Sequence, residues 1–107
     1  MDLPNYAYFQ GSIVPYAQAK VGVLTHALNY GTAVFGGMRG YWNPEQQQLY
    51  LFRPQDLFRR FLNSARLMRM SFDHSPESLT EVARQLVLSE GYRRDIYLRP
   101  LAYKADE

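Results

Sequence analysis

Residues 25–42, THALNYGTAVFGGMRGYW, constrain the fold more than any other part of the sequence. Glycines recur here inside an apolar, β-prone run, which indicates that a ligand or a second chain approaches the backbone closely. As a strand, residues 34–41 would place on one face Phe35, Gly37, Arg39 and Tyr41. A face with an aromatic wall, bare backbone and a cation suits a planar anion. The plainer alternative is a half-buried strand with a glycine bulge.

The composition excludes several classes of protein. The 107 residues are enough for one domain with a modest core, and no apolar stretch is long enough to cross a bilayer. A net charge of +2 does not indicate a nucleic-acid partner, and the sequence has no cysteine for disulfides or thiolate metal sites. Residues 1–4, MDLP, resemble neither a signal peptide nor a transit peptide. We therefore expect a cytoplasmic protein that binds neither nucleic acid nor membrane.

Short strands are predicted on both sides of the glycine-rich stretch. Residues 6–9 and 12–14 alternate as a hairpin around Gln10 and Gly11, since a two-residue turn needs a positive φ. Residues 26–30 allow one helical turn that ends at Gly31. Residues 49–52 would pair with residues 34–41 as a second hairpin. Residues 96–103 are predicted as the last strand, with Tyr97, Arg99, Leu101 and Tyr103 on one face and a bulge or sheet edge near Pro100.

Two helices are predicted between these strands. Residues 56–70 carry apolar side chains at spacings of three and four. The second helix begins after Ser75, a typical cap followed by proline and an acid, and Gly91 is a left-handed stop. The predicted fold is α+β: a mainly antiparallel sheet with both helices on one face, in a single domain of residues 1–107.

Arginine is the candidate chemistry. Arg39 and Arg99 each share a predicted strand face with an aromatic residue, and Arg60 borders the apolar stripe of the first helix. A guanidinium fork bonds two oxygens of a carboxylate or phosphate at once, so these arginines are expected to gather around an anion. Each of them alone is better explained as a solvated surface group. His26 is expected to be a structural hydrogen-bonder and His74 to be exposed, and no metal pair or catalytic triad is visible.

Several runs together resemble the branched-chain amino acid aminotransferases, which are fold-type IV pyridoxal-phosphate enzymes. The runs are HALNYGTAVFGGMR at residues 26–39, LFR at 51–53 continuing to Arg60, NSA at 63–65 and YLRPL at 97–101. The resemblance covers nearly the whole chain. It implies the smaller, N-terminal domain of such a homo-oligomeric enzyme, which transfers amino groups between leucine, isoleucine or valine and 2-oxoglutarate.

The resemblance also implies roles for single residues. Arg60 would contact the phosphate of pyridoxal 5'-phosphate, and Tyr30 would reach the site of a partner subunit. Phe35, Gly37, Tyr97 and Arg99 would line the pocket for the amino acid and the 2-oxo acid, with Arg99 on the distal carboxylate of glutamate. Arg39 joins this substrate-binding set because the period of two places it on the Phe35 face.

Two departures and one absence qualify the resemblance. The family usually has glutamate at the position of Gly36 and histidine at that of Leu57. The Schiff-base lysine lies in a C-terminal cofactor-binding domain that the 107 residues lack, and neither Lys20 nor Lys104 has its context. The isolated chain is therefore expected to be inactive and not to retain the cofactor. Alternatives are a domain of a D-amino acid aminotransferase or aminodeoxychorismate lyase, and a non-catalytic interaction module on the same scaffold.

Overall fold

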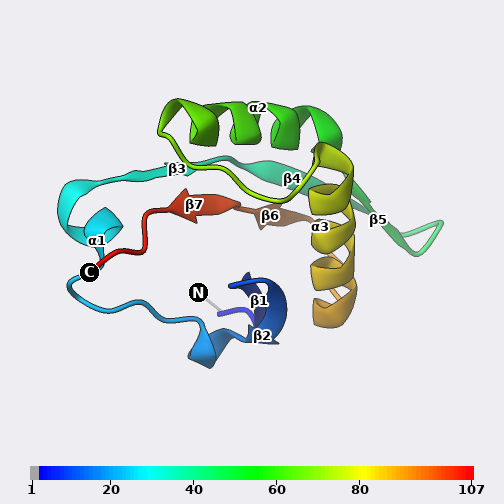
Figure 1. Ribbon diagram of the computed structural model, residues 1–107. Helices are drawn as coiled ribbons and strands as arrows, with labels where there is room; N and C mark the ends of the chain where they lie inside the picture. Colours follow the sequence, from blue (N-terminus) through cyan, green and yellow to red (C-terminus); the bar gives the residue numbers. More distant parts are fainter. Residues whose placement is uncertain (1–2) are drawn as a thin grey trace.

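The computed structural model describes residues 3–107. Residues 1 and 2 lie outside it, and they belong to the segment 1–4 that was compared with signal and transit peptides above. The elements in chain order are β1 (Tyr6–Phe9), β2 (Ser12–Pro15), the 3-10 turn η1 (Tyr16–Gln18), α1 (His26–Tyr30), β3 (Ala33–Phe35), β4 (Met38–Asn43), β5 (Gln48–Leu51), α2 (Pro54–Leu67), α3 (Pro76–Glu90), β6 (Ile96–Leu98) and β7 (Leu101–Tyr103). Figure 1 shows α2 lying along β3 and β4, and α3 running crosswise from α2 toward the β1–β2 hairpin.

The centre of the fold is a long antiparallel ladder that is interrupted once. β3 pairs with β7, and β4 pairs with both β5 and β6. Phe35 is opposite Leu101 and Met38 is opposite Leu98, so two residues intervene on each strand and the register is the same on both sides of the gap. The expected strands 34–41 and 96–103 are thus each split in two.

Proline explains the interruption. Pro100 has no N–H, so it cannot complete the pair of hydrogen bonds that opposite residues of an antiparallel ladder exchange. The N–H of Gly36 still donates to the carbonyl oxygen of Pro100, at 3.0 Å. Half of the pair therefore survives, and the predicted disturbance near Pro100 is confirmed.

Both predicted hairpins are confirmed. The β1–β2 turn uses Gln10 and Gly11, whose φ angles are 52° and 92°, as a two-residue turn of this hand requires. In the β4–β5 turn, the Asn43 side chain accepts hydrogen bonds from the backbone N–H groups of Glu45 and Gln46. The second hairpin pairs residues 40–43 with 48–51, because β4 extends beyond the predicted strand end.

Helix α2 supplies the largest share of the core, three of its seven buried residues. Its buried residues Phe58, Phe61 and Ala65 recur at three and four, as the sequence pattern predicted. They pack with Met38 of β4, Met70, Ala83 of α3 and Ala102 of β7. The helix begins at Pro54, two residues earlier than expected, because proline favours the first helical position. It ends at Leu67, three residues earlier than expected, because the chain then passes through Arg69 with φ 60°.

Helix α3 has the predicted boundaries. Ser75 accepts from the N–H of Ser78 and the Ser78 hydroxyl accepts from the N–H of Ser75, which forms a capping box. Gly91 ends the helix with φ 69°. The Glu90 carboxylate accepts from the N–H of Tyr6 at 2.6 Å, so α3 also holds β1. The α+β class with antiparallel sheets and two main helices is confirmed.

His74 differs from its prediction. It is half-buried rather than exposed, because its ring lies between β1 and the start of α3. Its Nδ1 is 3.0 Å from the Ser78 hydroxyl and its Nε2 is 3.4 Å from the Tyr8 hydroxyl.

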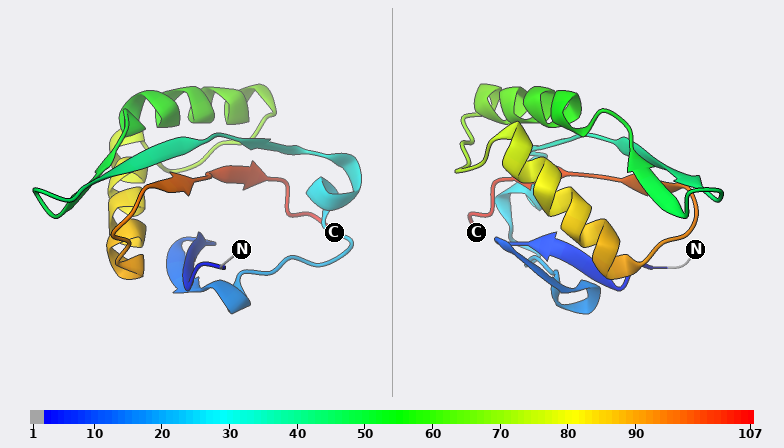
Figure 2. Two further views of the ribbon diagram at one scale, coloured as in Figure 1. Left: turned by 180° about the vertical axis from the view of Figure 1, so that it is seen from behind. Right: turned by 90° about the vertical axis from the view of Figure 1, so that its right-hand side faces the viewer.

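Helix α1 lies beside the C-terminal segment, as both views of Figure 2 show. The N–H groups of His26 and Ala27 donate to the carbonyls of Asp106 and Lys104, and Gly31 ends the helix with φ 69°. His26 is the structural hydrogen-bonder that was expected, since its Nδ1 is 2.8 Å from the Thr32 hydroxyl. Within residues 3–107, no helix has the length and apolarity needed to span a bilayer.

Candidate functional site

The strand faces on either side of the interruption differ in character. Met38, Gly40 and Ala102 are buried against α2, whereas their chain neighbours Arg39, Tyr41 and Leu101 are exposed. The alternation of buried and exposed residues along the strands therefore continues across the interruption. One exposed face, here called the open face, is formed by Phe35, Gly37, Arg39, Tyr41, Tyr97, Arg99 and Leu101.

Arg99 is held on the open face by two aromatic rings. Its guanidinium carbon lies 4.9 Å from the centroid of the Phe35 ring and 5.9 Å from that of Tyr97. Both distances are in the range of cation–π attraction. Among residues 3–107, Arg99 makes no ion pair and donates no side-chain hydrogen bond, so its five N–H donors are available to a ligand.

Tyr97 lies across the backbone of Gly37. A Cβ atom built on Gly37 would be 2.6 Å from Tyr97 Cζ and 2.9 Å from Cε2, and closer still to the hydroxyl oxygen. The ring therefore occupies the space that a side chain at position 37 would need. This explains, from the local contacts, why a glycine stands in a strand-like segment.

Arg39 continues the open face. It is opposite Tyr97 in the ladder and is exposed, and its carbonyl oxygen accepts from the N–H of Phe52 at 2.9 Å. The Tyr41 and Phe52 rings meet edge to face beside it, with centroids 6.3 Å apart. The open face is thus an aromatic surface that carries two arginines.

Arg60 comes from a different element. It is exposed on α2, one helical turn after Leu57, and no ion pair or hydrogen bond within residues 3–107 engages its side chain. Nor does it share the cation–π contacts that join Arg99 to Phe35 and Tyr97. The structure brings together Phe35, Gly37, Arg39, Tyr97 and Arg99, and a place for Arg60 in the same site stays a prediction.

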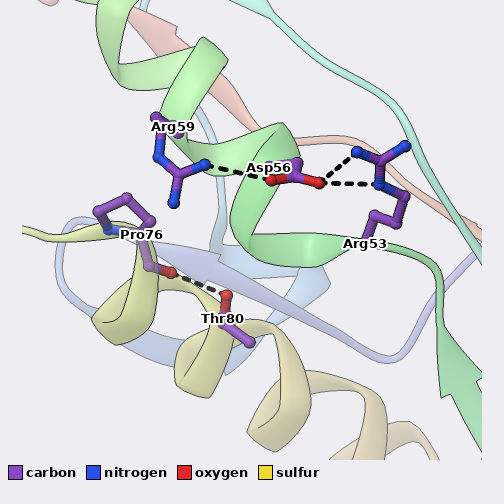
Figure 3. Close-up of polar contacts among 5 residues, drawn as sticks. All are labelled: Arg53, Asp56, Arg59, Pro76 and Thr80. Atoms are coloured by element: carbon purple, nitrogen blue, oxygen red, sulfur yellow. Dashed lines mark hydrogen bonds and ion pairs between the residues drawn. The ribbon is translucent and has the colours of Figure 1, made fainter.

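Arg53 and Arg59 are both paired with Asp56, as Figure 3 shows. Asp56 accepts from Arg53 Nε at 2.7 Å and from Arg59 at 3.1 Å. The pKa of the Asp56 carboxyl is lowered, first by the hydrogen bond from Arg53 and second by the positive charge of Arg53. One carboxylate thereby engages two arginines and offsets one of their two positive charges, and within residues 53–60 the cation left without a partner is Arg60. The i, i+3 spacing of these residues is a signal that the sequence interpretation did not use.

Tyr30 is apart from the open face. It is the last residue of α1 and is 73% exposed, with its ring stacked 4.6 Å from that of His26. No described contact joins Tyr30 to Arg99 or Arg60. Its predicted role at a partner subunit's site remains an expectation.

A shallow hollow adjoins Tyr97. It is lined by Tyr92, Arg94, Asp95, Ile96 and Tyr97. Asp95 accepts from the N–H of Trp42 at 2.8 Å, and burial raises the pKa of the Tyr92 hydroxyl. The sequence interpretation did not single out these residues. Residues 3–107 hold no cluster of histidine, aspartate and glutamate that could bind a metal.

Comparisons with known proteins give this arrangement a context. No family model matches the chain. A probable branched-chain-amino-acid aminotransferase of Aquifex aeolicus (strain VF5) is 39% identical over 102 residues, which are 95% of this chain and 33% of that protein.

Solved structures agree with the sequence comparison. The branched-chain aminotransferase of Thermoproteus uzoniensis with norvaline superposes with a TM-score of 0.88 at 37% identity, over 96% of this chain and 34% of that one. The branched-chain amino acid aminotransferase of Thermobaculum terrenum in its PLP form gives 0.84 at 38% identity, with coverages of 94% and 33%.

In sequence and in fold, the chain is therefore similar to the aminotransferases. More narrowly, the chain corresponds to the N-terminal third of the branched-chain aminotransferases. It spans about a third of the length of the relatives that it matches.

The two departures from the usual family residues are neighbours in space. A Cβ atom at position 36 would lie 3.6 Å from Leu57 Cδ1 and 3.5 Å from Pro100 Cγ. Position 36 therefore points toward α2 and away from the open face. A polar pair at positions 36 and 57 would be in contact, and here both members are apolar.

Proposed function

We propose that residues 1–107 are the small N-terminal domain of a fold-type IV, pyridoxal-phosphate-dependent branched-chain aminotransferase. The reaction is amino-group transfer between leucine, isoleucine or valine and 2-oxoglutarate. The observation that supports this best is the open face, on which an arginine without a carboxylate partner among residues 3–107 lies against two aromatic rings.

The open face has the chemistry that these substrates require. The Phe35 and Tyr97 rings and Leu101 supply apolar surface, 64%, 55% and 56% exposed, for a branched aliphatic side chain. Arg99, and Arg39 beside it, supply donors for the distal carboxylate of glutamate or 2-oxoglutarate. One face can then take the two kinds of amino donor alternately, with the aliphatic group on the rings and the carboxylate on the guanidinium.

The cofactor's phosphate suits Arg60. Its side chain is exposed, whereas the nearby Arg53 and Arg59 donate to Asp56. Within residues 53–60, Arg60 is therefore the arginine whose N–H donors are available to an anion. When bound, pyridoxal phosphate supplies the electron sink for the proton transfer at the substrate Cα. In this proposal the residues of this chain bind and orient, while a lysine outside residues 1–107 moves the proton.

The rest of the proposal concerns the whole protein. The Schiff-base lysine and most cofactor contacts would come from a C-terminal domain, so residues 1–107 alone would be inactive and would not retain pyridoxal phosphate. Tyr30 would reach the site of a partner subunit in a homo-oligomer, which is compatible with its exposed ring. A cytoplasmic location belongs to the same proposal.

The mass of the natural protein and its reaction with borohydride test this proposal. We expect a chain of roughly three times this length, since residues 1–107 span about a third of their relatives. Borohydride treatment should link pyridoxal phosphate covalently to one lysine beyond residue 107. A natural protein that ends near residue 107, or one that forms no such link, would exclude the aminotransferase and favour the interaction module.

A further inference from the structure

The φ angle at position 37 does not require a glycine. The glycines with φ in the left-handed region are Gly11, Gly31 and Gly91, and Gly37 is not among them. Any residue could therefore adopt the Gly37 backbone without strain. What excludes a side chain there is the Tyr97 ring, whose Cζ and Cε2 lie 2.6 Å and 2.9 Å from the place of a Cβ atom.

The adjacent Gly36 provides a natural contrast. Its φ is also outside the left-handed region, but a Cβ atom there would make only ordinary contacts, at 3.5 Å or more, with Pro100 and Leu57. The two neighbouring glycines lie on opposite faces of the strand, and they differ in the space beside them: position 36 has room for a methyl group and position 37 does not.

Tyr97 is one of the two aromatic rings beside the Arg99 guanidinium. With its ring over Gly37, Tyr97 lies 5.9 Å from the Arg99 guanidinium carbon, and Phe35 lies 4.9 Å from the same atom. A side chain at position 37 would push the Tyr97 ring off the backbone, and Arg99 would lose one of its two aromatic contacts.

We propose that Gly37 is a positioning residue: its missing side chain seats Tyr97, and Tyr97 with Phe35 fixes the Arg99 guanidinium for a planar carboxylate. The identity of the ligand rests on the proposed function, whereas the steric relation does not. A fixed guanidinium loses less conformational entropy on binding than a mobile arginine, so the effect of Gly37 should appear as carboxylate affinity.

The test uses the complete natural protein, with its arginines labelled by the NMR-active nitrogen isotope, and compares Gly37→Ala with Gly36→Ala. In wild type the Arg99 Nε–Hε resonance, assigned with Arg99→Lys, should carry a ring-current shift. We expect Gly37→Ala to remove at least half of that shift and Gly36→Ala to leave it unchanged. Affinity for glutarate, a dicarboxylate that needs no cofactor chemistry, should fall about fivefold in Gly37→Ala, the size expected for immobilising one rotamer-rich side chain on binding. In Gly36→Ala it should stay within about twofold.

A second pair of variants covers the case in which Gly37→Ala unfolds. In the Tyr97→Ala background, the methyl group at position 37 has no ring to displace, so Gly37→Ala should no longer lower the thermal midpoint. In the wild-type background it should lower that midpoint by about 5 °C or more. An equal loss in both backgrounds, or an unchanged Arg99 resonance and glutarate affinity in Gly37→Ala, would overturn the proposal. A protein without aminotransferase activity but with these shifts would refute the proposed function alone.

Discussion

The N–H of Gly36 donates to the carbonyl oxygen of Pro100 across the interrupted ladder, at 3.0 Å. This bond joins the β3–β7 pair to the β4–β6 pair at the point where proline removes the reciprocal donor. Because the register is unchanged across the gap, residues two apart keep the same face from Phe35 to Tyr41 and from Tyr97 to Tyr103. The open face therefore exists as one surface although the strands that form it are split.

Gly40 offers a stability test of the buried side of this ladder. A Cβ atom there would lie 2.8 Å from Ile96 Cγ1 and 3.4 Å from Leu51 Cδ2, in a buried position. We expect Gly40→Ala to lower the free energy of unfolding by roughly 1–3 kcal/mol, since the β-branched Ile96 cannot yield easily. Urea unfolding measures this. Gly36→Ala is the matched control and should be neutral or more stable by up to about 1 kcal/mol; an equal loss in both variants would show that the ladder is packed differently.

The capping box of α3 gives a second prediction. Ser75→Ala removes the hydroxyl that accepts from the N–H of Ser78 at 3.0 Å. We expect a loss of about 0.5–2 kcal/mol in the free energy of unfolding, the usual cost of losing a helix cap. Ser75→Asp should restore most of it, because aspartate caps equally well. If Ser75→Asp were as unstable as Ser75→Ala, capping would not be the source of the loss.

The ion pair on α3 gives a pH dependence. Arg84 donates two hydrogen bonds to Glu81, at 2.8 Å and 2.6 Å, and these lower the pKa of Glu81 from 4.5 to about 2. The folded pKa is below the unfolded one, so the pair's contribution is complete above pH 4.5 and is lost as the pH falls toward 2. We expect the wild type to lose more stability than Glu81→Gln over that interval, by a small amount because both groups are exposed. Parallel curves for the two proteins, at low salt, would contradict this.

Local patterns predicted much of this structure. The alternation of residues 34–41 and 96–103 gave the correct faces, and Ser75, Gly91, Gln10 and Gly11 act where their torsional and capping preferences predicted. Such features depend on neighbours in sequence, so one sequence suffices to predict them. The joining of Phe35, Tyr97 and Arg99 depends on pairing between strands far apart in the chain. Sequence alternation indicated that each strand had such a face, but not that both faces would be the same surface.

Long-range packing limited the remaining predictions. His74 was expected to be exposed because it lies just before a helix start, yet it is half-buried and contacts Tyr8 of the first hairpin. The gathering of Arg60 with Arg39 and Arg99 around an anion stays a prediction, since its side chain makes no hydrogen bond or ion pair within residues 3–107. The orientation of a helix on a sheet is set by tertiary contacts, which a periodic stripe does not specify.

Arg60 can be tested through the cofactor. We expect Arg60→Ala in the complete natural protein to weaken retention of pyridoxal phosphate at least tenfold, since a charged hydrogen bond contributes roughly 1.5–3 kcal/mol. Equilibrium dialysis with absorbance detection of the cofactor measures this. Arg66→Ala, on the same helix and also exposed, is the control and should bind as wild type does. Equal retention by Arg60→Ala and wild type would remove Arg60 from the cofactor site.

The donor preference of Arg99→Ala tests the role of the open face most directly. The measurement is kcat/KM for the amino-donor half-reaction with glutamate and with leucine, in wild type and in Arg99→Ala. Because the guanidinium would bind the distal carboxylate and the rings the aliphatic side chain, glutamate should lose at least tenfold more than leucine. Equal losses for the two donors would show that Arg99 does not recognise the distal carboxylate and that the open face is not the substrate surface.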